Sequence, residues 1–459
     1  MKPQILKKIQ ALVGKENVSQ QMEDRICHSY DATKQSFLPE AVVKPITKEE
    51  ISGILELANQ ESIPVYPYGA ASGRSGGALP VKGGLVFDFI RMNRILEVNR
   101  ENMMALVEPG VVITDLQKEV EKQGLFYPPD PASADFATIG GSVAECAGGL
   151  RCIKYGVTRD YVLALEVVLP TGKIIHTGRA TLKSVTGYDL TRLMVGSEGT
   201  LGIFTRITLK LIPLPIHVAT LGAFFKDIKE AYHLFNNILL SGILPRALEF
   251  MDQHSIRAVA QQQKSDVPAE AEVFVLIEID GASAGGVKEE AVQVHRQLLQ
   301  AQPLKLIKAE DENTRQELWD FRKAISSALF SVCARKVSED ICVARDKLLE
   351  MIRKIRQLEQ EYHIPMAIFG HAGDGNLHVD LLIPDSLKDD EVKIEKAVKD
   401  ILDETIKQGG TLSGEHGIGN VKADYLPLEI PRVELDLMKQ IKHLVDPKGI
   451  MNPGKIFSL

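Results

Sequence analysis

Hydrophobic and polar residues change their spacing several times along this chain, and each change predicts an element. Up to about residue 210, short apolar runs of strand length alternate with stretches that have the spacing of amphipathic helices. The apolar runs predict strands at about residues 42–43, 65–67, 85–88, 104–108, 161–169 and 173–176. Helices are expected at about residues 48–60 and 113–123, after a polar, helical lead-in over residues 1–37. Strands that alternate with helices indicate an α/β region.

The pattern changes after Pro213 and Pro215, because two prolines in close succession interrupt both a strand ladder and a helix. Strand-length runs then occur at about residues 218–225, 247–251, 273–280 and 341–345. Helical spacing is found at about residues 228–240, 288–300, 315–330, 347–362, 388–407 and 433–444. Long helices between separated strands predict an α+β region.

The stretch GHAGDGNLH, residues 370–378, combines a turn with two histidines. Polar and apolar residues alternate along residues 377–381, which is the period of a half-buried strand. Because Asp374-Gly375 is a standard turn signal, we expect a β-hairpin with His371 and His378 opposite one another across the ladder. Directly opposed side chains have Cβ atoms roughly 4.5–5.5 Å apart, close enough for two imidazoles to bind one metal ion.

A second motif, SGEHG at residues 413–417, adds Glu415 and His416. With His371 and His378, Glu415 completes a predicted site for a divalent metal, and two imidazoles with a carboxylate suit zinc, iron or manganese. The structural alternative is that the histidines only cap a tight turn. Apolar side chains would stabilise a purely structural hairpin at lower cost, so the metal site is the favoured interpretation.

Composition and charge limit the classes of function. A chain of 459 residues suggests two or three domains, and 44% hydrophobic with 25% charged residues is ordinary for a globular protein. The net charge of −7 argues against nucleic-acid binding. The N-terminal segment lacks the apolar core of a secretory signal, and no apolar run approaches the length of a transmembrane segment.

The cysteines are odd in number and lack the C-x-x-C spacing of zinc or iron–sulfur sites. They are Cys27, Cys146, Cys152, Cys333 and Cys342. A reduced, cytoplasmic chain is therefore expected rather than a disulfide scaffold. Any iron–sulfur cluster that accepts electrons from this protein is expected on another subunit.

Four glycine-rich stretches between residues 69 and 203 have too few large side chains to build a core. The first is GAASGRSGG at residues 69–77, and small side chains there allow backbone N–H groups to converge on an anion such as a pyrophosphate. Taken alone, this first stretch could equally be a flexible loop. Neither a G-x-G-x-x-G turn nor a P-loop lysine is present, and four spaced loops suit a long ligand such as a dinucleotide.

The motifs and their order resemble the FAD-binding domain of the vanillyl-alcohol oxidase/p-cresol methylhydroxylase superfamily. The segments that carry the resemblance are PYGAASGRSGG, PPDPAS with TIGGSVAECAGG, KYGVTRDYVLALEVVLPTG and VTGYDLTRLMVGSEGTLGIFT. Within it, the chain is similar to the type 4 FAD-binding oxidoreductases/transferases, which include the glycolate oxidase flavin subunit, D-lactate dehydrogenases and D-2-hydroxyglutarate dehydrogenase. The resemblance implies an α+β fold, with a split α/β FAD-binding domain of p-cresol methylhydroxylase type and an α+β cap domain with an antiparallel sheet.

The implied domain division follows the pattern changes. After the lead-in over residues 1–37, we expect the FAD-binding domain at 38–215 and a substrate or cap domain with the metal site at 216–425. Residues 426–459 are expected to form a C-terminal helix and tail that pack back on the FAD-binding domain.

The resemblance also implies which residues hold FAD, which we expect to be noncovalently bound. They are Pro67, Gly69, Ala70, Ser72, Gly73, Arg74, Ser75, Gly76, Pro131, Ser133, Gly140, Gly141, Ser142, Gly148, Gly156, Gly199, Gly202, Ile203 and Asn452. The chain departs from the family pattern at Ala70-Ala71-Ser72, where Gly-Gly-Thr is more usual, and at Cys146, where Asn is usual. Neither departure removes a backbone donor.

Four side chains are candidates for the chemistry. An imidazole can accept a proton at neutral pH, and the resemblance assigns the role of base to His416. The resemblance places a substrate-carboxylate arginine at Arg322, whose planar guanidinium suits bidentate binding. Lys336 is a weaker candidate, and Asn376 could hydrogen-bond the substrate from the hairpin.

Together these features predict an FAD- and metal-dependent dehydrogenase that oxidises a small D-2-hydroxy acid to the 2-oxo acid. Glycolate or D-lactate is expected ahead of D-2-hydroxyglutarate. Electrons are expected to pass to a protein partner, either an electron-transferring flavoprotein or an iron–sulfur subunit. The alternatives are a noncatalytic flavoprotein subunit of a larger complex and a flavin-dependent transferase of alkylglycerone-phosphate synthase type.

Overall fold

A computed structural model describes residues 1–457 of the chain. The chain forms two compact units, which are built from interleaved stretches of sequence. The first unit contains residues 1–149, 157–214 and 415–459, and the second contains residues 150–156 and 215–414. The domain boundaries expected from the sequence stay a prediction, because compact units need not coincide with functional domains.

The first unit contains a four-stranded sheet in the order β1-β2-β4-β3. Its strands are β1 (Val18–Ser19), β2 (Ala41–Val43), β3 (Val65–Tyr68) and β4 (Leu85–Asp88). Strands β2, β4 and β3 are parallel, as expected for an α/β region, whereas β1 is antiparallel to β2. Helices α1 (Pro3–Val13) and α3 (Lys48–Glu61) bury their apolar faces in the same core as these strands.

A five-stranded antiparallel sheet, in the order β5-β6-β10-β8-β9, is the second sheet of this unit. Its strands are β5 (Ile95–Asn99), β6 (Met104–Val107), β8 (Val162–Val168), β9 (Ile174–Gly178) and β10 (Ile203–Lys210). Strands β8 and β9 confirm the strands predicted at about residues 161–169 and 173–176, and they pair as an antiparallel hairpin. The remaining elements include α2 (Met22–Cys27), α4 (Ile113–Glu121), β7 (Leu125–Phe126), α5 (Ile139–Glu145), α7 (Leu190–Met194), β11 (Ile212–Pro213), α15 (Leu426–Glu429) and α16 (Arg432–Val445).

The second unit is built on a seven-stranded, wholly antiparallel sheet in the order β15-β12-β14-β13-β17-β18-β16. Its strands are β12 (His217–Phe225), β13 (Ala247–Asp252), β14 (Val273–Gly281), β15 (Lys305–Lys308), β16 (Arg335–Cys342), β17 (Met366–His371) and β18 (Asn376–Ile383). This antiparallel sheet with its helices confirms the predicted α+β organisation.

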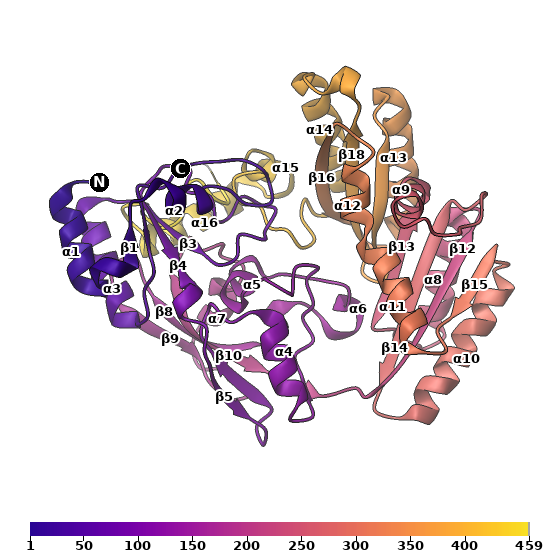
Figure 1. Cartoon of the computed structure of the whole chain (residues 1–459), viewed down its shortest axis with the longest axis horizontal. Coiled ribbons are helices and arrows are strands. Elements are labelled where there is room, and N and C mark those ends of the chain that lie inside the picture. Colours follow the sequence, from indigo (N-terminus) through magenta and orange to yellow (C-terminus); the bar gives the residue numbers. More distant parts are fainter. Residues whose placement is uncertain (458–459) are drawn as a thin grey trace. The chain divides into compact units, whose positions relative to one another are not determined.

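Helices cover both faces of this sheet (Figure 1). The buried side chains of α9 (Gln253–Gln263), α11 (Glu312–Lys323) and α12 (Ile325–Phe330) form one core with Ala247, Met251, Phe274 and Ala367. The other helices of the unit are α6 (Cys152–Tyr155), α8 (Ile228–Leu240), α10 (Ala284–Gln300), α13 (Leu348–Tyr362) and α14 (Glu391–Lys407). Phe250, the neighbour of Met251 on β13, points to the opposite face and packs on Phe235 of α8.

Two expectations for this unit were wrong in detail, and two elements were missed. The helix predicted at about 315–330 is two helices that meet at Ala324, and the strand predicted at about 341–345 runs instead over residues 335–342. Helix α9 and strand β15 were not predicted. The strand β16 was misplaced because Lys336, Ser338 and Asp340 are polar but lie on a covered face, so its sequence lacks the apolar alternation of a core strand.

Candidate metal centre and active site

The predicted hairpin is present, with β17 and β18 joined by a turn over residues 372–375. Its register corrects the prediction that the two histidines oppose each other. His371 pairs with Asn376, and His378 pairs with Phe369, so the histidines are diagonal neighbours on one face. Their ring centroids lie 5.4 Å apart with the planes nearly perpendicular. Diagonal neighbours still lie within reach of long side chains.

Gly375 makes this turn possible. Its φ of 85° is in the left-handed region, and a Cβ atom there would overlap the carbonyl oxygen of Val343. The Asp-Gly turn signal in the sequence therefore has a direct structural cause.

His371 is oriented by a buried carboxylate. Glu249 lies opposite it on β13, and the Nδ1 of His371 is 2.6 Å from Glu249 Oε1. The Glu249 side chain is completely buried. Because a carboxylate on Nδ1 fixes the tautomer and directs the other ring nitrogen outward, Nε2 is the atom of His371 that would bind a metal.

His378 has a similar arrangement on its other side. Asp340 of β16 pairs with it in the sheet register, and the Nδ1 of His378 lies 3.7 Å from Asp340 Oδ1. Asp340 also accepts hydrogen bonds from Asn376 Nδ2 at 2.7 Å and Ser413 Oγ at 3.0 Å. Carboxylates beside metal-binding histidines are the usual second layer of a metal site.

His371, His378 and Glu415 each offer a ligand atom, and these atoms lie within 4.8 Å of one another. Glu415 directly follows Gly414, whose Cα lies against Asn376 of the hairpin. Two imidazoles and a carboxylate can bind a divalent metal and leave coordination positions for a substrate. The side chains therefore fit the metal that the sequence suggested, and this set is a candidate metal centre.

Helix α11 and strand β16 bring further charges to the same face of the sheet. Arg322 donates from Nε and Nη2 to Glu249 Oε2, at 3.0 and 2.7 Å, and its guanidinium lies over the ring of Phe369. Glu249 therefore links Arg322 directly to His371. Lys336, on β16, pairs with Asp380 at 2.7 Å.

The two polar atoms of the Asn376 side-chain amide differ in their hydrogen bonding. Its Nδ2 donates to Asp340 and to the carbonyl of Ile341, whereas its buried Oδ1 has no hydrogen-bond partner within residues 1–457. A buried acceptor without a partner is unusual and fits a position that a ligand hydroxyl would fill.

The loop that carries His416 is anchored in the first unit. Glu198 accepts hydrogen bonds from the backbone N–H groups of Ile418 and Gly419 at 2.8 and 2.7 Å. Two ionisable groups near Glu198 are also buried. Burial, together with Glu198, raises the pKa of Glu145 well above its ordinary value, and burial lowers the pKa of Lys455 to about 8. The role of His416 stays a prediction.

The first glycine-rich stretch, residues 69–77, fits an anion. Among residues 1–457, the N–H groups of Ala70, Ala71, Ser72 and Gly73 donate no hydrogen bond to the main chain. Ala71 has a φ of 49°, and left-handed residues of this kind help successive N–H groups to point to one side. Their contact with the pyrophosphate of FAD stays a prediction.

The other residues predicted to hold FAD occupy three kinds of position. The second stretch is not a loop: Gly140, Gly141 and Ser142 belong to helix α5, which Thr138 caps. Some glycines make room for protein atoms, because a Cβ atom at Gly76 would meet Asn420, at Gly140 Pro109, at Gly148 Glu415, at Gly199 Pro67 and at Gly202 Val167. Pro67 lies within β3, and Ile203 is the first residue of β10. Partly buried positions are found at Gly69, Arg74, Pro131 and Ser133. Their contacts with FAD stay predictions.

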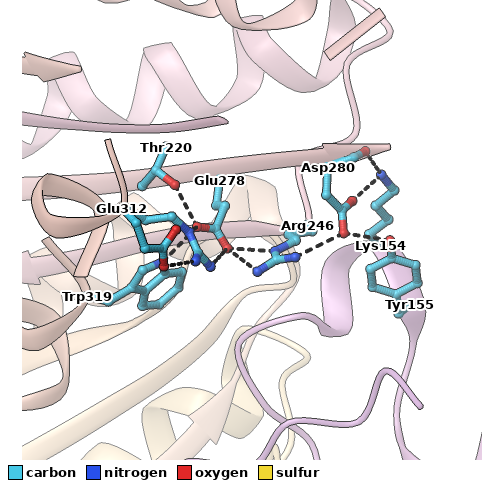
Figure 2. A network of polar contacts seen from close by, with 9 residues as sticks. Lys154, Tyr155, Thr220, Arg246, Glu278, Asp280, Glu312 and Trp319 are labelled. Atoms are coloured by element: carbon cyan, nitrogen blue, oxygen red, sulfur yellow. Dashed lines mark hydrogen bonds and ion pairs between the residues drawn. The ribbon is translucent and has the colours of Figure 1, made fainter. Parts of the chain in front are cut away.

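Gly156 lies at the end of residues 150–156, a short stretch that belongs to the second unit. Figure 2 shows how Lys154 and Tyr155 join a buried network there, in which Asp280 accepts bonds from Lys154 Nζ at 2.6 Å and Tyr155 Oη at 2.8 Å. Arg246 connects Asp280 to Glu278. This network was not expected from the sequence.

Three further residues at the centre were missed. They are Glu249 and Asp380, each an acidic residue on a strand of otherwise mainly apolar neighbours, and Asp340, which lies on the more polar strand β16. A lone acidic residue at a buried strand position is a usable signal, because burying it without a partner is costly.

The sequence is similar to known FAD-dependent enzymes over nearly its whole length. Residues 39–178 match the family described as FAD binding domain, and residues 214–456 match the family described as FAD linked oxidases, C-terminal domain. The glycolate oxidase subunit GlcD of Bacillus subtilis is 41% identical over 446 residues, which are 97% of this chain and 95% of that protein. The D-lactate dehydrogenase of Anaerostipes hadrus is 35% identical over 463 residues, 99% of this chain and 97% of that protein.

Solved structures share the fold at lower identity. p-Cresol methylhydroxylase superposes with a TM-score of 0.80 and 17% identity, over 99% of this chain and 96% of that one. Alkyldihydroxyacetonephosphate synthase gives a TM-score of 0.77 and 21% identity, over 99% of this chain and 85% of that one. Among residues 1–457, none of the helices is both long enough and apolar enough to span a membrane.

Proposed function

This chain belongs to the FAD-linked oxidase family and is an FAD-dependent 2-hydroxy-acid dehydrogenase, and from this premise we propose that a divalent metal at His371, His378 and Glu415 takes part in its reaction. We propose a small D-2-hydroxy acid as substrate, with glycolate or D-lactate ahead of D-2-hydroxyglutarate. The names of the two relatives support the first two acids.

The observation that carries the metal proposal is the convergence of three ligand atoms within 4.8 Å, with a buried carboxylate at the Nδ1 side of each histidine. Carboxylates at the Nδ1 side orient metal-binding histidines so that Nε2 faces the ion. A divalent ion bound there would lower the pKa of a bound substrate hydroxyl.

Oxidation of a 2-hydroxy acid removes a hydride from C2 and a proton from the hydroxyl. FAD, when bound, accepts the hydride. We assign the proton to His416, because an imidazole can accept a proton at neutral pH. Arg322 would bind the substrate carboxylate through its outer edge, since Glu249 occupies its Nε and Nη2. Asn376 Oδ1 is a candidate acceptor for a substrate group.

The reduced flavin requires an electron acceptor, and we propose a protein partner, either an electron-transferring flavoprotein or an iron–sulfur subunit. None of the five cysteines forms a disulfide bond, and no C-x-x-C spacing suggests a cluster within this chain. Cysteines that stay reduced also support our proposal that the enzyme works in the reducing cytoplasm.

Anaerobic flavin reduction tests the proposed function. FAD-loaded, metal-replete protein is mixed with glycolate, D-lactate or D-2-hydroxyglutarate, and the absorbance of oxidised flavin is followed. At least one acid should bleach the flavin, and failure of all three would contradict the proposal. If the chain were only an electron-transfer module, replacing both His371 and His378 by Ala would leave any bleaching intact.

Metal content gives a second, independent measurement. The variant His378→Ala should lose most of its bound metal, measured by mass spectrometry after dialysis against a weak chelator. The variant His443→Ala alters an exposed histidine of α16 and serves as the control. Equal metal content in both variants would contradict the assignment of His378 as a ligand.

A further inference from the structure

A second buried ion pair lies beside the candidate metal centre. Lys336 Nζ is 2.7 Å from Asp380 Oδ2, and both side chains are only 1% exposed. Lys336 also lies 3.2 Å from Ser326 Oγ and 4.5 Å from the centre of the Phe330 ring. Protein groups thus surround this ammonium.

The sheet places this pair next to the metal ligands. Asp380 is two residues beyond His378 on β18, so it lies on the same face at a distance of about 7 Å along the strand. Lys336 is on the neighbouring strand β16, and Ser326 is one helical turn beyond Arg322. The pair and Arg322 therefore border one region of the sheet face.

The two cations differ in what they can still bind. Arg322 uses Nε and Nη2 on Glu249, and its Nη1 donates no hydrogen bond within the part of the chain that the structure describes. That donor suits one substrate carboxylate. The charge of Lys336, by contrast, is balanced by Asp380.

We propose that Asp380 determines specificity: by neutralising Lys336, it restricts the enzyme to 2-hydroxy acids with a single carboxylate. This inference rests on the proposed function and names the class of acid. A second carboxylate, as in D-2-hydroxyglutarate, would approach Lys336 only beside the carboxylate of Asp380. Two like charges at short range in a buried site repel strongly, so a dicarboxylate is rejected.

A purely structural role explains the pair less well. Strands β16 and β18 are already joined along eight register pairs from Arg335 to Cys342, so the sheet does not need a buried ion pair to hold them together. Buried ion pairs are also weak contributors to stability, because desolvation offsets most of their attraction.

The test compares kcat/KM for D-lactate and for D-2-hydroxyglutarate with FAD-loaded, metal-replete enzyme. The wild-type protein should strongly prefer D-lactate. Asp380→Asn keeps the shape and a hydrogen-bond acceptor but leaves Lys336 uncompensated, so the ratio of the two kcat/KM values should fall on the order of 100-fold. In the double variant Asp380→Asn/Lys336→Gln the ammonium is also removed, and the gain for the dicarboxylate should disappear.

Ligand binding supplies a readout that does not depend on turnover. The thermal midpoint of the Asp380→Asn variant should rise more with 2-oxoglutarate than with pyruvate, whereas the wild-type protein should show the opposite order. Asp403→Asn is the matched control, because Asp403 also pairs with a lysine, Lys399 at 2.6 Å, but on the surface of α14. Asp403→Asn should leave the ratio of the two kcat/KM values unchanged, and it should keep the wild-type order of the two thermal shifts.

The inference is overturned if the wild-type enzyme oxidises D-2-hydroxyglutarate as well as D-lactate, a result that needs no variant. It is also overturned if Asp380→Asn folds but leaves the ratio unchanged. Both outcomes keep a working 2-hydroxy-acid dehydrogenase, and they are therefore distinct from failure of the proposed function, in which no acid reduces the flavin.

Discussion

Glu249 contacts two candidate active-site residues at once. One of its carboxylate oxygens lies 2.6 Å from His371 Nδ1, and the other accepts two bonds from Arg322. The side chain is completely buried, so among residues 1–457 its charge is balanced by these neighbours alone. Glu249 therefore orients both a candidate metal ligand and the candidate substrate arginine.

We predict that Glu249→Gln weakens metal binding. The amide keeps the shape of the carboxylate but not its charge, so it orients His371 less well, and loss of such a group typically costs 10–100-fold in metal affinity, about the size expected here. Competition with a chelator of known affinity measures the change.

The control for this prediction is Glu270→Gln, because Glu270 pairs with Lys226 on the surface. Its metal affinity should equal that of the wild-type protein. Unchanged affinity in Glu249→Gln would mean that Glu249 does not act through His371. A melting curve for each variant separates a metal effect from loss of folding.

At the scale of elements, helices α11 and α12 present one stripe of side chains to the sheet. Its members are Arg315, Trp319, Arg322, Ser326 and Phe330, at spacings of three or four residues. Arg315 and Trp319 bond Glu278, Arg322 bonds Glu249, and Ser326 and Phe330 contact Lys336. Apart from the exposed Phe330, the members of the stripe are buried or partly buried, and each of its charges meets an opposite charge on a strand.

We predict that acid weakens the second unit through Glu278. Burial alone would raise the pKa of this carboxyl, but Arg246, Arg315 and Thr220 outweigh burial and lower it to about 2. A carboxyl whose folded pKa is lowered contributes stability above its unfolded pKa and loses it as pH falls toward the folded value. The free energy of unfolding should therefore fall between about pH 4.5 and pH 2, by on the order of 3 kcal/mol from this group.

Trp319 can report this change, because it is the only tryptophan of the chain and its Nε1 donates to Glu278 at 2.8 Å. Urea unfolding followed by its fluorescence at several pH values measures the free energy. Glu278→Gln should be less stable at neutral pH and should lose less stability on acidification. Glu310→Gln, at an exposed position, should follow the wild-type curve. Parallel curves for wild-type protein and Glu278→Gln would contradict the prediction.

At the scale of the whole molecule, the end of the chain completes the first unit. Asn452 donates from Nδ2 to the carbonyls of Gly77 and Glu198, at 2.8 and 2.6 Å. Lys455 Nζ donates to the carbonyl of Leu79 at 2.8 Å, and Lys442 Nζ to that of Thr200 at 2.7 Å. Side chains near the C-terminus thus hold two of the glycine-rich stretches at buried positions.

We predict that Asn452→Ala weakens FAD binding. The substitution leaves two buried carbonyls without a donor, each at a cost of about 1–3 kcal/mol, and it loosens the stretches that are expected to hold the cofactor. FAD affinity should fall roughly tenfold or more by the same reasoning, measured by titrating apoprotein with FAD and following flavin fluorescence.

Asn237→Ala is the control for this prediction, because Asn237 is an exposed residue of α8. It should leave FAD affinity unchanged. Equal FAD affinity in Asn452→Ala and wild-type protein would show that these stretches keep their shape without the hydrogen bonds from Asn452.

Features with local causes were predictable from the sequence. The turn at Gly375 follows from its left-handed backbone, and alternation along residues 377–381 marks strand β18, so the hairpin and its histidines were correctly expected. The motif order also predicted the fold class and the FAD-dependent dehydrogenase. These signals depend on residues that are neighbours in sequence.

The partners of the site residues could not be predicted in this way. Glu249 is 122 residues from His371, and only the pairing of β13 with β17 brings them together. The register that makes the histidines diagonal neighbours, and the pairing of Lys336 with Asp380, likewise depend on how strands from distant parts of the chain align. The sequence alone determined which side chains could do chemistry, because turn chemistry and periodicity act locally. Tertiary structure decided which charges they meet, because long-range strand pairing and burial set those contacts.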